Sequence, residues 1–68
     1  MTDVKALVGI MEQRGKSKRA TANALNINRT TLYRKLEGEG ISFTVGEVRE
    51  LIEFLSLTRD EVYAIFLS

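Results

Sequence analysis

The sequence predicts a single all-α domain, a compact arrangement of five short helices that spans residues 1–68. Three observations favour this fold class. The apolar residues recur at helical spacings of three and four positions. No proline interrupts the chain, and no alternating stretch is long enough to indicate a sheet. Two short motifs, which begin at Thr44 and Thr58, have the pattern of capping boxes at helix starts.

The first helix is expected at about residues 3–14. Thr2 or Asp3 can cap its first turn, because a short polar side chain accepts a hydrogen bond from a free backbone N–H there. Its apolar stripe consists of Val4, Leu7, Val8 and Met11. Gly9 costs about 1 kcal/mol relative to alanine inside a helix, so we expect close packing around it. Gly15 is expected to end the helix.

The second and third helices are expected to form a pair at about residues 17–37. A short helix at 18–25 is followed by a left-handed turn at Asn26 and a third helix at 29–37. The expected N-caps are Ser17 and Asn28. The expected inward residues of the pair are Thr21, Ala22, Leu25, Ile27, Leu32 and Leu36. The expected outward residues of the third helix are Arg29, Thr30, Tyr33 and Arg34.

The last two helices begin with clear signatures. The connection "EGEG" at 37–40 leads to "FTVGEV", in which Thr44 and Glu47 form a capping box. Phe43 and Val48 stand at the positions of a hydrophobic staple. The fifth helix repeats the capping box with Thr58 and Glu61. The apolar residues that follow are Val48, Leu51, Ile52, Leu55, Val62, Ile65 and Phe66.

The net charge of +1 conceals a strong separation of charge along the chain. From Arg14 to Lys35 there are seven basic residues and no acidic residue. From Glu37 onward there are seven acidic residues and two arginines, which gives a net charge of −5. Such a separation is typical of a protein that presents one face to a polyanion. A solvated basic face without a partner explains the charges alone equally well.

Several classes of function are disfavoured by the composition. Without cysteine or histidine, the chain has no disulfide framework and no thiolate metal site. A glycine-rich phosphate loop and a framed pair of carboxylates are also missing, so we expect no enzymatic activity, no metal and no cofactor. No apolar run approaches the roughly 18 residues of a membrane span, and no signal peptide is visible. We therefore expect a cytoplasmic protein without a small-molecule ligand.

Two short helices joined by a tight turn, of which the second is cationic on its outer face, are typical of a helix-turn-helix. The major groove of B-DNA is about 12 Å wide and admits one α-helix. Arginine bonds two acceptors of guanine, and threonine contacts a thymine methyl group or donates a hydrogen bond. Lysines and backbone amides nearby bind phosphates and fix the register. The stretch "NINRTTLYRKL" at 26–36 supplies these groups, so we expect a turn and a DNA-reading helix.

The segment "SKRATANALNINRTTLYRKL" resembles the helix-turn-helix of the Cro and phage-repressor family, the lambda-repressor-like DNA-binding domains. The segment "FTVGEVRELIEFLSLTRDEVYAIFL" is similar to the last two helices of small phage repressors of Gram-positive hosts. The resemblance covers nearly the whole chain. It implies a regulator in the cytoplasm or nucleoid of a bacterial host, which represses by occupying promoter DNA. With no room for a ligand-sensing domain, a Cro-type protein is expected.

The resemblance also implies which residues contact DNA. Its base-reading positions fall on Arg29, Thr30 and Arg34, and Tyr33 either joins them or packs its ring against the preceding helix. The phosphate-contacting positions that it implies are Lys18, Asn28 and Lys35, with Lys16 and Arg19 as looser phosphate neighbours. Two positions depart from the family. Thr21 stands where a large aliphatic residue is common, and Lys18 replaces a frequent glutamine, which exchanges a hydrogen-bonding anchor for a point charge.

The expected partner is a palindromic double-stranded DNA operator, bound by a homodimer with half-sites about one helical turn apart. The apolar C-terminal residues exceed what so small a core can bury, and the resembling family often forms its dimer seam there. The candidate seam residues are Tyr63, Phe66 and Leu67; core packing is the alternative. A second function also stays open, an antirepressor-like protein-interaction module that uses the acidic fourth and fifth helices.

Overall fold

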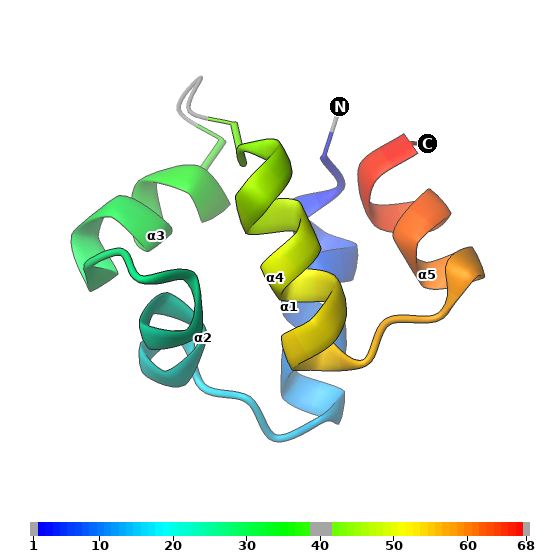
Figure 1. Ribbon diagram of the computed structural model, residues 1–68, viewed down its shortest axis with the longest axis horizontal. Coiled ribbons are helices and arrows are strands. Elements are labelled where there is room, and N and C mark those ends of the chain that lie inside the picture. Colours follow the sequence, from blue (N-terminus) through cyan, green and yellow to red (C-terminus); the bar gives the residue numbers. More distant parts are fainter. Residues whose placement is uncertain (1, 39–41, 68) are drawn as a thin grey trace.

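The computed structural model describes residues 2–38 and 42–67, and within them the fold is all-helical without strands (Figure 1). The elements are α1 (Val4–Gln13), α2 (Lys18–Leu25), α3 (Arg29–Leu36), α4 (Val45–Leu55), α5 (Arg59–Val62) and the π-helical turn η1 (Tyr63–Leu67). The all-α prediction is therefore confirmed. Of the connection expected at 37–40, Glu39 and Gly40 lie outside the described residues.

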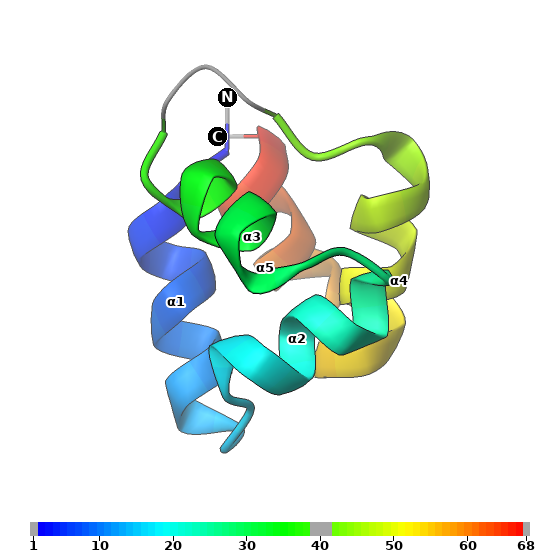
Figure 2. The ribbon, with the colours of Figure 1, turned by 90° about the vertical axis from the view of Figure 1, so that its left-hand side faces the viewer.

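The helices form two sides around a central pair. Helices α2 and α3 lie together on one side, α5 and η1 lie on the opposite side, and α1 and α4 lie between them (Figure 1). Seen from the α2–α3 side, α1 and α4 flank the two short helices (Figure 2). Near the two chain ends, the backbone N–H of Asp3 donates to the carbonyl of Ile65 at 2.6 Å, which joins the start of α1 to η1.

The helix starts are capped as the sequence predicts. The side chain of Asp3 accepts a hydrogen bond from the backbone of Ala6 at 3.1 Å. Both capping boxes are present, because Thr44 and Glu47 exchange hydrogen bonds at the start of α4, and Thr58 and Glu61 do so at the start of α5. Each cap satisfies N–H groups that have no partner within the helix, so the starts of these three helices are set locally.

The core is made mostly of leucine. The buried apolar residues are Leu7, Met11, Ala22, Leu25, Leu32, Leu51, Leu55 and Ile65, and those packed against them include Ile10, Ile27, Leu36, Phe43, Phe54 and Phe66. Thr21 is fully buried among them. Its hydroxyl donates to the carbonyl of Ser17 at 2.8 Å, so this buried polar group has a partner. The small side chains of α2 allow that helix to lie against both α3 and α4.

The structure differs from the sequence-based expectations at three places. The expected close packing around Gly9 is wrong, since a Cβ atom built there meets nothing within 4 Å. The end of α4 has a left-handed residue, Ser56, with φ of 52°, which the sequence pattern did not indicate. The predicted fifth helix is α-helical only over Arg59–Val62 and continues as the π-helical η1.

No helix within residues 2–38 and 42–67 has the length and apolar character needed to cross a lipid bilayer. The longest, α4, has 11 residues. The same part of the chain contains no group of three or more acidic side chains placed to hold a metal ion.

Candidate nucleic-acid interface

The α2–turn–α3 unit is fixed by three local devices. The Ser17 side chain accepts a hydrogen bond from the backbone of Ala20 at 3.0 Å and caps α2. Asn26 adopts the predicted left-handed conformation, with φ of 58° and ψ of 41°. The Asn28 carboxamide oxygen accepts from the backbone of Thr31 at 2.7 Å and caps α3. The turn is therefore specified by Asn26 and by the caps on either side of it.

Helix α3 is divided into an inner and an outer face. Leu32 is fully buried, and Leu36 packs against the core. The four residues predicted to face outward are all exposed: Arg29, Thr30, Tyr33 and Arg34. Positions 29, 30, 33 and 34 share one side of a helix, because 3.6 residues make one turn. The outer face of α3 thus carries two guanidinium groups, a hydroxyl and a phenol in one row, which we call the outer row.

The outer row has the chemistry that major-groove recognition needs. Guanidinium groups donate to the acceptor pair of guanine, and a threonine side chain contacts the thymine methyl group or donates its hydroxyl hydrogen to a base acceptor. Within the described residues, neither Arg29 nor Arg34 forms an ion pair. Helix α3 lies on the outside of the molecule, so no other helix covers its outer face (Figure 2). The row is therefore accessible to a partner.

Three further cations lie around the start of α2. Lys18 and Arg19 are exposed on its first turn, which contains no acidic residue. Lys16 is half-buried, and its Nζ lies 4.9 Å from the centroid of the Phe54 ring on α4. The free N–H groups at a helix start also favour an anion. Lys18 and Arg19 are thus accessible for phosphates, while Lys16 is held against the protein by its ring contact.

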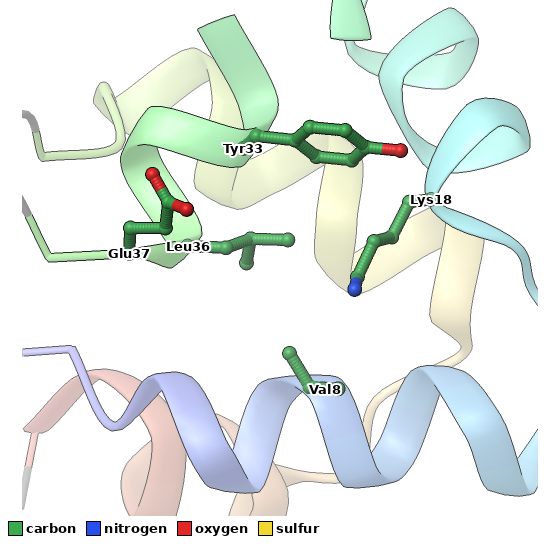
Figure 3. Close-up of a pocket in the computed structure, with 5 residues that line it drawn as sticks. All are labelled: Val8, Lys18, Tyr33, Leu36 and Glu37. Carbon is green, nitrogen blue, oxygen red and sulfur yellow. The ribbon is translucent and has the colours of Figure 1, made fainter. Parts of the chain in front are cut away.

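Tyr33 combines the two roles between which the sequence did not decide. Its side chain is 42% exposed, yet its ring faces back toward α2, where Lys18 Nζ lies 5.7 Å from the ring centroid. Figure 3 shows the phenol pointing toward Lys18. Both side chains line a hollow of about 240 Å³ between α1, α2 and α3, together with Val8, Leu36 and Glu37.

Lys35 is a correction to the predicted phosphate contacts. Its side chain is buried, at 7% exposure for the residue, and Nζ donates to the carbonyl of Ser42 at 2.8 Å. Nζ also lies 3.1 Å from Glu47 Oε1 and 5.5 Å from the centroid of the Phe43 ring. Position 35 follows Leu32 by three, but Arg29 precedes Leu32 by three and is exposed, so helical spacing alone does not separate the two positions. The contacts with Ser42, Phe43 and Glu47 are what oppose a phosphate contact at Lys35.

Arg14 is the second cation of the basic segment that is used inside the protein. Its Nη2 lies 2.7 Å from Glu61 Oε2, and this ion pair joins the end of α1 to α5. The hydrogen bond from Arg14, followed by that from the Thr58 backbone, lowers the pKa of the Glu61 carboxyl below its usual value. Removing Arg14 and Lys35 from the seven cations leaves 7 − 2 = 5 that form no ion pair within the described residues. These are Lys16, which contacts the Phe54 ring, and the exposed Lys18, Arg19, Arg29 and Arg34.

The candidate dimer-seam residues differ in exposure. Tyr63 and Leu67 are 61% and 65% exposed, whereas Phe66 is half-buried and packs against the core. Val45, which the sequence did not single out, is 78% exposed at the start of α4. Tyr63 and Leu67 lie in η1 on the side of the molecule opposite α2 and α3 (Figure 1).

Comparison with known proteins identifies no relative: no family model, no curated protein and no solved structure matches the chain. Its function therefore has to be inferred from its own side chains and their arrangement. The features that bear on it are the exposed outer row of α3, the cations at the start of α2 and the apolar residues of η1.

Proposed function

We propose that this chain is a sequence-specific regulator that binds double-stranded DNA, of the phage or prophage Cro or repressor type. In this proposal α3 enters the major groove, and Arg29, Thr30 and Arg34 contact base edges. Repression follows from occupation of promoter DNA. The observation that carries the proposal is the outer row, which presents a hydroxyl and two guanidinium groups on one exposed helix face, with no ion-pair partner for either guanidinium among the described residues.

Phosphate contacts complete the proposed interface. Lys18 and Arg19 flank the outer row from the first turn of α2, and Asn28 precedes it at the start of α3. Tyr33, held near Lys18, adds a phenol at the junction of the two helices. Contacts of this kind fix the orientation of α3 on the duplex, whereas base contacts supply the specificity.

The direct test is selection from random duplex DNA at about 0.15 M salt, a physiological ionic strength. The expected result is an enriched palindrome with half-sites about 10 bp apart, as for a dimeric operator-binding protein. Enrichment of a single half-site would support DNA binding but contradict binding as a dimer. Absence of any enrichment, with the protein folded, overturns the proposal.

A substitution then tests the outer row itself. Arg34→Ala is expected to weaken binding to the selected duplex by about 1–3 kcal/mol, the value of a bidentate base contact. Arg59→Ala is the matched control, because Arg59 is an exposed arginine at the start of α5, on the opposite side of the molecule. Equal affinity of the Arg34→Ala variant and the wild type contradicts base reading by Arg34.

A protein-interaction module is the second candidate, and one observation favours it. Glu50 and Glu53 are exposed on α4, and neither forms an ion pair within the described residues. A basic partner protein would contact this acidic face. Reversing both charges to lysine should then abolish partner binding while Arg34→Ala has no effect, which is the opposite of the pattern expected for an operator-binding protein.

A further inference from the structure

The buried ammonium group of Lys35 connects α3 to the start of α4. Lys35 lies in the last turn of α3, and its three contacts are with Ser42, Phe43 and Glu47 beyond the connection. Glu47 Oε1, which lies 3.1 Å from Nζ, also accepts the backbone N–H of Thr44 at 2.9 Å. One carboxylate oxygen therefore serves the cap of α4 and the ion pair with α3 together.

This arrangement restricts the rotation of α3. Successive residues of an α-helix are separated by about 100° around the axis. Turning α3 by one residue would move Nζ away from Glu47 and Ser42, and the mostly buried Glu47 carboxylate would lose its cation. Removing a partner from a buried ion pair is strongly unfavourable, so one rotational setting of α3 is strongly preferred. Since the outer row lies on the same helix, its direction depends on the same contact.

We propose that Lys35 is a positioning residue, which sets the orientation of the outer row through its ion pair with Glu47. This inference rests on the proposed function, because it gives Lys35 a role in DNA recognition without any contact with DNA. It replaces the phosphate contact that the sequence indicated at this position. The two roles make opposite predictions for a change at Glu47.

Glu47→Gln separates the two roles by the sign of its effect. Glutamine retains an oxygen for the Thr44 N–H, so the capping box is preserved while the charge is removed. If Lys35 binds a phosphate, loss of the neighbouring carboxylate frees the ammonium and affinity for DNA rises. If Lys35 positions α3, affinity falls even though the protein becomes more positive. We expect a fall of about tenfold, as when one base contact is misplaced.

Lys35→Met supplies a second readout, the dependence of affinity on salt. Each phosphate contact contributes about 0.9 to the slope of log K against log salt concentration. A positioning role predicts weaker binding of Lys35→Met with the wild-type slope. Lys18→Met is the matched control, because Lys18 is exposed and its loss should reduce the slope by about 0.9. If Lys35→Met does not fold by circular dichroism, the Glu47→Gln measurement decides alone.

The probe is the duplex selected by the wild-type protein, and amide hydrogen exchange is measured on the same variants. Weaker binding of Glu47→Gln together with an unchanged slope for Lys35→Met supports positioning. Equal or tighter binding of Glu47→Gln, or a slope reduced for Lys35→Met, overturns it. If the wild type selects no duplex, the proposed function fails. The positioning role is then tested by amide hydrogen exchange alone. If Glu47→Gln speeds exchange in α3 more than in α1, relative to the wild type, the positioning role is supported. If the two helices respond equally, the positioning role is overturned.

Discussion

Two glycines, one in the middle of α1 and one just beyond its end, should respond in opposite directions to the same substitution. Gly9 lies inside α1, and a Cβ atom there meets nothing within 4 Å, so Gly9→Ala introduces no clash. Alanine is favoured over glycine in a helix by about 1 kcal/mol, and we expect the free energy of unfolding to rise by that amount. Gly15 has φ of +65°, a conformation that costs an alanine about 1–2 kcal/mol. Gly15→Ala should therefore lower the free energy of unfolding.

Urea unfolding followed by far-UV circular dichroism measures both variants against the wild type. A change of 1 kcal/mol corresponds to about 4–8 °C in Tm for a domain of this size, so thermal unfolding gives an independent reading. Each variant serves as the control for the other, because the side chain added is identical. Destabilisation by Gly9→Ala would refute the reasoning, since it would require neighbours that the geometry does not contain.

Three further predictions concern the helix ends. Ser56→Gly should stabilise the fold by about 1 kcal/mol in urea unfolding, because Ser56 has a positive φ that glycine adopts freely. The pKa of Glu61 is lowered by Arg14, so its ion pair contributes stability above the usual glutamate pKa of about 4.3. That contribution is lost as the pH falls through the lower folded-state pKa. The stability difference between wild type and Glu61→Gln should therefore shrink on acidification, and a constant difference in acid titrations of unfolding would contradict it. Asn28→Asp should keep the α3 cap and its stability, since aspartate caps as well as asparagine, while weakening binding to the selected duplex if Asn28 lies against a phosphate; unchanged binding argues against that contact.

The features predicted from the sequence are those that short stretches of chain determine. Helical spacing located the helices, and the capping boxes at Thr44 and Thr58 fixed the starts of α4 and α5. The left-handed turn at Asn26 followed from the ability of asparagine to adopt positive φ. The outward direction of Arg29 and Arg34 followed from the positions of Leu32 and Leu36 on the same helix.

The features that the sequence did not predict depend on contacts between distant residues. Arg14 was counted with the basic face, but its partner Glu61 lies 47 residues away. The sequence predicts a phosphate contact for Lys35, whereas the partners of its ammonium group are Ser42 and Glu47, just before and in the first turn of α4. Charge along the chain therefore overstated the charge available to a partner. Gly9 predicts close packing from the sequence, but a glycine inside a helix does not by itself require a close neighbour, and none lies within 4 Å of a Cβ atom built there.

The hydrogen bond between Asp3 and Ile65 makes the two ends of the described chain interdependent. Asp3 caps α1, which contributes the fully buried Leu7, while Ile65 is itself fully buried. Fraying of α1 at its start would break this bond and loosen η1, and opening of η1 would remove a partner from the start of α1. Terminal segments of most domains unfold locally at little free-energy cost. Here the two ends are expected to open together, as one cooperative unit with the core.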